Sequence, residues 1–336
     1  MFKKIKELII DEYKTIIIGL ALYIIFQIPV NYYIVIGGGV QPLGKRIEVE
    51  NKYESKGTFN LSYVSELKGT ILTYGLSFII PTWERENADL YKYDVQESIE
   101  DINFRSELDL KTVNGNATYW AYTLANKNVN LSSSKLYVIA TDKEHKNPLE
   151  IQDEIISMDG NHYETSDEYI KYINTLEEND TINVKVVRKG KEKDIQAKVY
   201  KYNDRKIIGV AIQYVHEYET DPKIKIKFNN DESGPSGGMI TTLEIYNQLT
   251  EKDLTRGRTI AGTGTIESDG SIGEIGGIEH KILGAAKAKV DLFLVPSGQN
   301  YKDAVKYKKN KKLKIKLVEV KNIKEVIDIL EEEKWE

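Results

Sequence analysis

Residues 262–286 read GTGTIESDGSIGEIGGIEHKILGAA. The glycine-punctuated first part of this stretch predicts a β-hairpin and a turn, and the last part predicts a helix. The apolar face of that helix consists of Ile278, Ile282 and Ala285, which recur at helical spacing. Lys281 lies on the same helix among isoleucine and alanine residues. A lysine in such surroundings is a candidate catalytic base, whereas a lysine on an amphipathic helix is most often a surface residue.

A second glycine-rich stretch, residues 229–238, follows a strand predicted to end at Phe228 and precedes a helix predicted to begin near Gly237. Ser236 would then lie at a helix N-terminus, where free backbone N–H groups and the positive end of the helix dipole point outward. Such donors stabilise a tetrahedral oxyanion, and the N–H of Gly237 is a candidate for this role. Serine also caps helices without any catalytic role. This stretch alone supports both interpretations equally.

Residues 234–238 also satisfy the G-x-S-x-G motif of the α/β-hydrolase nucleophile elbow. That elbow requires a tight strand–serine–helix turn, but Ser236 lies eight residues beyond Phe228. It also requires a late histidine, with an acid between the serine and that histidine. His280 is the only histidine after Ser236, and no acid between them is clearly placed for this role. An esterase of this type is therefore disfavoured.

Two further motif matches fail on their sequence context. The stretch Ser132–Lys135 matches the S-x-x-K pattern of penicillin-binding proteins, but neither S-D-N nor K-T-G accompanies it. The stretch Gly39–Lys45 nearly matches a phosphate-binding P-loop. However, Arg46 replaces the Ser or Thr that binds Mg²⁺, and a strand is predicted to follow instead of a helix. The sequence therefore predicts no ATPase site.

Taken together, the stretches around Ser236 and Lys281 resemble the proteolytic domain of the Lon family. In that family a serine within G-P-S-[AG]-G pairs with a lysine in a helix that follows I-G-G. Ser236 and Lys281 fall on these positions, and Thr263 falls where the family has a threonine that hydrogen-bonds the lysine. The resemblance extends over roughly residues 206–333. It implies a Ser–Lys dyad in which Ser236 is the nucleophile, Lys281 is the general base and Thr263 orients the lysine.

A free lysine amine has a pKa near ~10.4 and is protonated at pH 7, so it cannot accept the serine proton. Burial in a dry site disfavours the ammonium form and lowers that pKa. We therefore expect Lys281 to be buried, to take the proton of Ser236 during acylation and to deliver it to the leaving amine. The 4 histidines are scattered without ligand spacing, so neither a metal nor another cofactor is expected.

Residues 128–205 predict a small β-rich domain with one helix. A strand and turn over residues 153–161 are followed by a helix over Ser166–Leu176, with Ser166 as its N-cap, and by a hairpin across Lys189-Gly190. This order resembles the PDZ domains of bacterial proteases. The resemblance implies peptide capture by strand addition, but the carboxylate-binding loop of that family is not recognisable, so no pocket residue is assigned. A purely structural β-module is the alternative.

The N-terminus predicts a membrane anchor. Lysines within residues 1–14 precede an apolar run that extends to about Ile36 and is broken only by Gln27, Pro29 and Asn31. A run of ~20 apolar residues is what a helix needs to cross a bilayer of ~30 Å. Because the lysines precede the run, residues 1–14 are expected in the cytoplasm and the remainder outside. A cleavable signal peptide and a buried core helix are the alternatives, and neither suits the length and flanks of this run.

Composition excludes several classes of protein. The chain has 336 residues, no cysteine and a net charge of −5. Disulfide frameworks, thiolate metal sites and cysteine nucleophiles are therefore ruled out. A mildly acidic chain gives no indication of a nucleic-acid partner. A lysine-rich segment, residues 302–316, is interpreted as a solvated helix, loop and edge strand rather than an anion site.

These observations predict an α+β or α/β multidomain protein with an N-terminal transmembrane helix, a PDZ-like domain and a C-terminal Lon-type proteolytic domain. The expected boundaries are a tail at 1–14, a transmembrane anchor at 15–37, a juxtamembrane β/α segment at 38–127, the PDZ-like domain at 128–205 and the proteolytic domain at 206–336.

The whole chain resembles the PDZ-containing Lon-like proteases of Gram-positive bacteria, some of which process secreted peptides such as pheromones. The expected function is that of an ATP-independent, membrane-anchored serine endopeptidase, with its catalytic domain outside the cell, that cleaves peptide or unfolded protein substrates. A homo-oligomer is possible because Lon proteolytic domains form rings. The main alternative is a membrane-anchored peptide-binding scaffold whose Lon-like domain is inactive.

Overall fold

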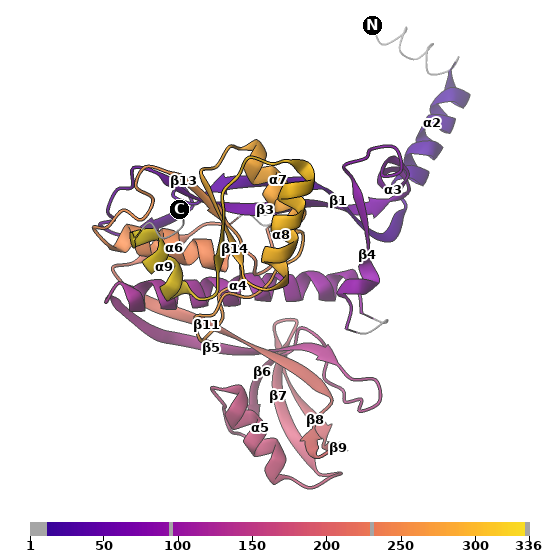
Figure 1. Cartoon of the computed structure of the whole chain (residues 1–336). Helices are drawn as coiled ribbons and strands as arrows, with labels where there is room; N and C mark the ends of the chain where they lie inside the picture. The colour runs from indigo at the N-terminus through magenta and orange to yellow at the C-terminus, as the bar shows by residue number, and fades with distance from the viewer. Residues whose placement is uncertain (1–11, 94–96, 229–231, 333–336) are drawn as a thin grey trace, which may run out of the picture. The chain divides into compact units, whose positions relative to one another are not determined.

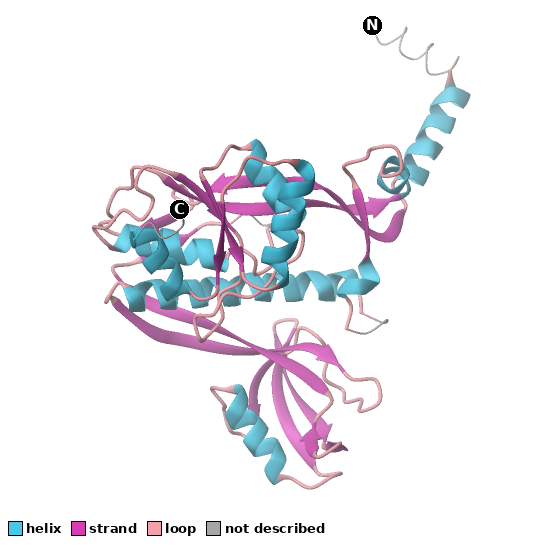
Figure 2. Cartoon of the chain, viewed as in Figure 1, coloured by secondary structure: helices cyan, strands magenta, loops and turns pink. Residues whose placement is uncertain are grey.

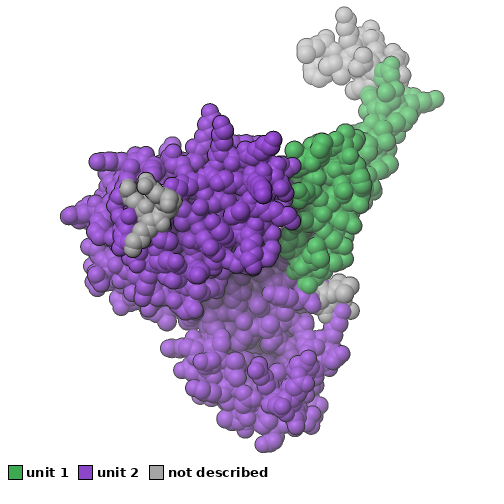
Figure 3. All heavy atoms as spheres, in the orientation of Figure 1, with its two compact units in different colours: residues 1–38, 64–92 green, residues 39–63, 93–336 purple. Residues whose placement is uncertain are grey.

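The computed structural model of the chain describes residues 12–93, 97–228 and 232–332. Clustering of contacts divides the chain into two compact units, which are coloured separately in Figure 3. The first unit comprises residues 1–38 and 64–92, and the second comprises residues 39–63 and 93–336. The element labels below are those of Figure 1.

Within residues 12–38 and 64–92, the structure describes two helices, a short strand, a 3₁₀ turn and parts of two longer strands. These are α2 (Tyr13–Phe26), α3 (Ile71–Leu76), β4 (Glu84–Asn87), η1 (Ala88–Tyr91), the first part of β1 (Pro29–Pro42) and the last part of β3 (Thr58–Thr70). Strand β4 pairs antiparallel with β1, where Tyr32 lies opposite Asn87 and Val35 lies opposite Glu84. Helix α3 begins with a capping box in which Thr70 and Thr73 bond each other's backbone N–H.

The expectation of a transmembrane helix over residues 15–37 is wrong. Helix α2 has 14 residues and is therefore about 21 Å long, short of the ~30 Å hydrocarbon layer. Proline at position 29 disfavours continuation of the helix, and the β-branched and aromatic residues that follow enter β1 instead. Among the residues that the structure describes, no helix is long and apolar enough to span a bilayer. The expected anchor, membrane partner and extracytoplasmic location are corrected accordingly, and residues 1–11 of the predicted tail lie outside the described residues.

One part of the second unit is a sheet with helices on both faces (Figure 2). The strand order is β15-β14-β13-β3-β1, and β3, β13, β14 and β15 are parallel neighbours. The newly named strands are β13 (Thr259–Gly262), β14 (Leu292–Pro296) and β15 (Leu317–Val320), and the helices are α4 (Ile99–Leu124), α6 (Gly238–Leu249), α7 (Ile278–Lys287), α8 (Gln299–Lys311) and α9 (Ile323–Glu332).

Alternate residues of the sheet enter two hydrophobic cores. Ile260, Leu292 and Leu294 pack with residues of α4, α6 and α9. Ala261 and Phe293 face the other side and pack with residues of α7 and α8. All five residues of β14 are buried, as expected for a parallel strand covered on both faces.

The remaining part of the second unit is a five-stranded antiparallel sheet in the order β11-β5-β6-β7-β8. Its elements are β5 (Asn128–Thr141), β6 (Glu154–Met158), α5 (Ser166–Thr175), β7 (Thr181–Arg188), β8 (Lys191–Lys198) and β11 (Val210–Asp221), with a small pair formed by β9 (Tyr200–Tyr202) and β10 (Arg205–Ile207). Lys189 and Gly190 both have positive φ in the β7–β8 turn, as a type I′ hairpin requires. The N-cap of α5 is Thr165, which accepts a hydrogen bond from the N–H of Glu168, and is not Ser166 as expected.

Candidate active site

Ser236 lies just before α6, and the N-cap of that helix is Gly237. The preceding strand, β12 (Ile224–Ile226), ends two residues earlier than the sequence predicted. Ser236 itself is half-buried. Because the cap position belongs to a glycine, the interpretation of Ser236 as a plain helix cap loses its support.

The carbonyl oxygen of Ser236 is held by the segment that follows β13. It accepts one hydrogen bond from the backbone N–H of Gly264 at 2.8 Å and another from the Thr263 hydroxyl at 3.1 Å. The carbonyl of Gly264 in turn accepts from the N–H of Met239 in α6, at 3.1 Å. These three bonds join the serine segment to the end of a central strand of the sheet.

Lys281 lies on α7 and is only 3% exposed. Its Nζ donates a hydrogen bond to Oγ1 of Thr263 at 3.1 Å, and Thr263 is fully buried. The Thr263 hydroxyl therefore accepts from the lysine and donates to the serine carbonyl. The structure thus places Ser236, Thr263 and Lys281 in one hydrogen-bonded group, although they come from three separate elements.

Glycine is required beside the serine because neighbouring side chains come very close. A Cβ at Gly237 would lie 2.6 Å from Cδ1 of Leu61. A Cβ at Gly238 would lie 2.3 Å from Cγ2 of Val113 and 2.8 Å from the backbone nitrogen of Ile266. Real Cβ contacts essentially never fall below 3.0 Å. These glycines therefore allow α6 to start against β3, α4 and the turn after β13.

Helix α4 also contacts the segments that carry Ser236 and Thr263. No motif in the sequence indicated these contacts. The carbonyl of Ser106 accepts a hydrogen bond from the N–H of Gly234 at 3.0 Å, just before the serine. The side-chain amide of Asn116 donates to the carbonyl of Ile266 at 2.9 Å. One helix thus fixes both the serine segment and the turn after β13. The first of these contacts uses a backbone carbonyl, which no side-chain motif could have revealed.

A further contact missed at the sequence level is an ion pair between Arg46 and Glu232. Both Nη atoms of Arg46 donate to the Glu232 carboxylate, at 2.6 and 2.5 Å. The carbonyl of Arg46 also accepts from the N–H of Lys227 at 2.9 Å. Arg46 precedes β2 (Ile47–Val49), which pairs with β12. Arg46 therefore contacts the chain before Ser236 at two points, the backbone of Lys227 and the side chain of Glu232.

We predict that Arg46→Ala lowers kcat by roughly tenfold to a hundredfold and changes KM little, because misplacing a nucleophile by about 1 Å has effects of this size. The measurement is steady-state cleavage of a peptide substrate. Lys227→Ala is the matched control, because Lys227 forms an exposed pair with Glu48 on the same two-stranded ribbon. An unchanged kcat in folded Arg46→Ala would show that this pair does not position the serine.

A buried carboxyl group fixes the middle of α6. Glu244 is 6% exposed, and burial raises the pKa of its carboxyl above the ordinary value. Its Oε1 accepts from the Gln248 amide at 2.7 Å, and that amide also bonds the carbonyl of Ile47 at 2.9 Å. These hydrogen bonds join α6, the helix that follows Ser236, to β2. We assign them a structural role.

The P-loop-like and S-x-x-K motif matches lie wholly or partly in β-strands. Gly39–Pro42, the start of the near-match to a P-loop, belong to β1, and Ser132 and Lys135 both lie within β5. Across residues 12–93, 97–228 and 232–332, no group of three or more His, Asp or Glu side chains is placed to hold a metal ion.

Comparison with known proteins gives the class of each part. Residues 217–332 match the model of the Lon protease (S16) C-terminal proteolytic domain, and residues 127–199 match the PDZ domain model. The chain therefore contains a proteolytic domain of the Lon serine-peptidase type and a PDZ domain. The sequence-based resemblance to these two domains is confirmed.

Among curated relatives, Lon protease 2 of Herpetosiphon aurantiacus and Lon protease of Trichlorobacter lovleyi are each 34% identical over 98 residues. The match covers 29% of this chain and only 12% of either relative. Among solved structures, the PDZ domain of an SdrC-like protein from Listeria monocytogenes is 24% identical, with a TM-score of 0.23. That match covers 25% of this chain and 92% of the other.

Proposed function

We propose that the chain is an ATP-independent serine endopeptidase in which Ser236 is the nucleophile and Lys281 is the general base. The substrates are peptides or unfolded polypeptides. One observation carries the proposal: a lysine 3% exposed donates to a buried threonine whose hydroxyl binds the carbonyl of the serine. Burying a lysine amine costs free energy. Buried titratable groups with a specific partner are concentrated at functional sites.

The proposed chemistry follows from this arrangement. Burial disfavours the ammonium form, and a neutral amine has one lone pair besides its N–H groups. Donation of one N–H to Thr263 restricts the orientation of the amine. The lone pair takes the Ser236 proton as Oγ attacks the scissile carbonyl, and the oxyanion is stabilised by backbone N–H groups at the start of α6, such as that of Gly237. Lys281 then gives the proton to the leaving amine and serves as the base again when water hydrolyses the acyl-enzyme.

The presence of a PDZ domain favours the proposal that the substrate is a polypeptide. Domains of this class capture extended peptides by strand addition. In this chain the five-stranded sheet has β11 and β8 at its edges. We propose that the PDZ domain, within residues 128–205, presents substrate to the proteolytic domain within residues 206–336.

The proposal is tested by incubating the full chain with casein, with and without ATP. We expect cleavage in both conditions and none with Ser236→Ala. Cleavage only with ATP would contradict ATP independence. Absence of cleavage of casein and of a peptide library by folded wild-type protein would favour the inactive scaffold instead.

We also predict that Thr263→Val lowers kcat by about a hundredfold, whereas Thr263→Ser retains most of it. Valine has nearly the same shape but removes both the acceptor for Lys281 and the donor to Ser236. Losing buried hydrogen bonds also lowers the free energy of unfolding by about 1–3 kcal/mol. The measurements are peptide cleavage and urea unfolding. Wild-type kcat in Thr263→Val would mean that the hydroxyl does not orient the lysine.

A further inference from the structure

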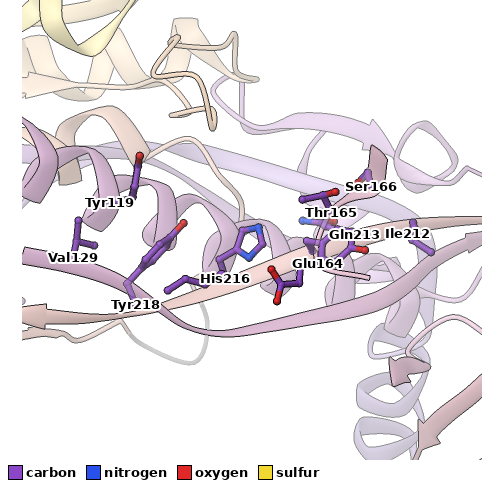
Figure 4. A pocket seen from close by; sticks show the side chains of 11 residues that line it. Tyr119, Val129, Glu164, Thr165, Ser166, Ile212, Gln213, His216 and Tyr218 are labelled. Carbon is purple, nitrogen blue, oxygen red and sulfur yellow. The ribbon is translucent and has the colours of Figure 1, made fainter. Parts of the chain in front are cut away.

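The serine side of the proposed dyad is supported by helix α4. The carbonyl of Ser106 on α4 accepts from the N–H of Gly234, just before the serine. Helix α4 is itself packed on β11: Figure 4 shows Tyr119 of α4 beside Tyr218 of β11, and their rings are 5.6 Å apart. Lys281 lies on a different helix, α7, whose position needs a support of its own.

Helix α7 begins close to Lys281 and without a side-chain cap. Its N-cap is Gly277, which has a φ of 67° and no side chain to bond the first N–H groups of the helix. Lys281 ends the first turn, where its N–H donates to the carbonyl of Gly277 at 3.1 Å. Helix ends fray when their free N–H groups lack partners. The position of Lys281 therefore depends on how the loop before Gly277 is held.

Asn300, near the start of α8, holds this loop by both polar backbone groups of one residue. Its Oδ1 accepts from the N–H of Ile275 at 2.8 Å, and its Nδ2 donates to the carbonyl of Ile275 at 3.0 Å. Asn300 is 7% exposed, so these bonds form away from water. The side chain of Ile275 packs in the same hydrophobic core as Ile278 of α7 and Ala304 of α8. The loop is therefore fixed to α8 through its backbone and a side chain.

Glu274 makes a second contact between the loop and α8. Its Oε1 accepts from the backbone N–H of Asn300 at 3.3 Å and also from that of Gln299. The N-cap of α8 is Gly298, so the carboxylate supplies the cap that this glycine lacks and complements the positive end of the helix. A Cβ at Gly298 would lie 2.7 Å from Oε1 of Glu274, so the glycine leaves room for the carboxylate.

We propose that Asn300 and Glu274 are positioning residues for Lys281. They fix the loop before α7 to the start of α8, and the two helices lie side by side on one face of the sheet (Figure 1). The inference rests on the proposed function, in which Lys281 is the general base. Its amine stays buried and directed at Thr263 because the first turn of its helix is kept from shifting or fraying.

The test is steady-state cleavage of a peptide substrate by the full chain over a range of pH. We expect Asn300→Ala to lower kcat at pH 7 by about a hundredfold and to change KM little, because displacing a reacting group by about 1 Å has effects of this size. A loosened first turn admits water to the amine, which raises the pKa of Lys281. The rise of kcat with pH should therefore move upward by about one pH unit, since only the neutral amine accepts the serine proton.

Asn310→Ala is the matched control, because Asn310 is an exposed asparagine on the same helix. It should leave kcat and its pH dependence unchanged. Glu274→Gln should keep most of the activity, since its amide oxygen still accepts from the two N–H groups, whereas Glu274→Ala should lower kcat by roughly tenfold. Equal activity of these two variants would contradict the role of Glu274, and the pair decides the question if Asn300→Ala does not fold.

Wild-type kcat and an unchanged pH dependence in folded Asn300→Ala would overturn the proposal. A lower kcat with an unchanged pH dependence would also overturn it, because the surroundings of the Lys281 amine would then be intact. Absence of cleavage by the wild-type chain would instead refute the peptidase proposal. In that case hydrogen exchange still tests the contact with α8: residues 275–281 should exchange faster in Asn300→Ala than in Asn310→Ala, and equal rates would refute it.

Discussion

Replacing Lys281 with methionine is expected to abolish peptide cleavage while the protein stays folded. Methionine preserves the length of the side chain but cannot accept the proton of Ser236. Removal of a base that acts as a unit with its nucleophile reduces kcat by at least about 10⁴-fold. Lys281 is 3% exposed, and replacing its buried polar amine with an apolar group of similar length removes the cost of keeping that amine away from water. We therefore expect an unchanged or higher midpoint of urea unfolding together with loss of activity.

The matched control is Lys287→Met, an exposed lysine on the same helix, which should keep full activity. Ser236→Ala should lose as much activity as Lys281→Met, and the double variant should lose little more, because the two groups act in one step. Substantial cleavage by folded Lys281→Met would contradict the assignment of Lys281 as the base.

Replacing Gly238 with alanine is expected to impair both stability and activity. The new Cβ would lie 2.3 Å from Cγ2 of Val113 and 2.8 Å from the backbone nitrogen of Ile266, so either α6 or its neighbours must move. Overpacking of a dense core costs typically 1–3 kcal/mol. Because Ser236 lies two residues before Gly238, the same shift displaces the nucleophile. We expect a lower urea midpoint and a kcat reduced by about a hundredfold.

The control for this experiment is Gly75→Ala. Gly75 lies in helix α3, and a Cβ there would have no atom within 4 Å. Its substitution should leave activity unchanged and leave stability the same or slightly higher, because alanine is the better helix former. If Gly238→Ala behaved like Gly75→Ala, the close packing around the start of α6 would not govern the position of the serine.

The grouping of Ser236, Thr263 and Lys281 could be expected only through the resemblance of their motifs to the Lon proteolytic domain, because no local pattern brings three distant residues together. The β7–β8 hairpin could be predicted from the residues themselves, since Lys189 and Gly190 determine their own turn geometry. In such cases neighbouring residues carry the information, and the rest of the chain does not alter it.

The remaining features depend on contacts between distant residues. Arg46 and Glu232 are 186 positions apart, and neither belongs to a motif. The contact of α4 with the serine segment uses the carbonyl of Ser106, a group that every residue has. The apolar run at residues 15–37 wrongly predicts a spanning helix, because hydrophobicity alone does not distinguish such a helix from a shorter helix followed by a paired strand.

The central claim is that Lys281 activates Ser236. The most direct test is covalent labelling of the full chain with a peptidyl fluorophosphonate, with the modified residue located by mass spectrometry. We predict that the wild-type chain and Lys287→Met are modified at Ser236, and that Lys281→Met is not. Equal modification of Ser236 in all three proteins, or modification of a different serine in the wild-type chain, would contradict the account.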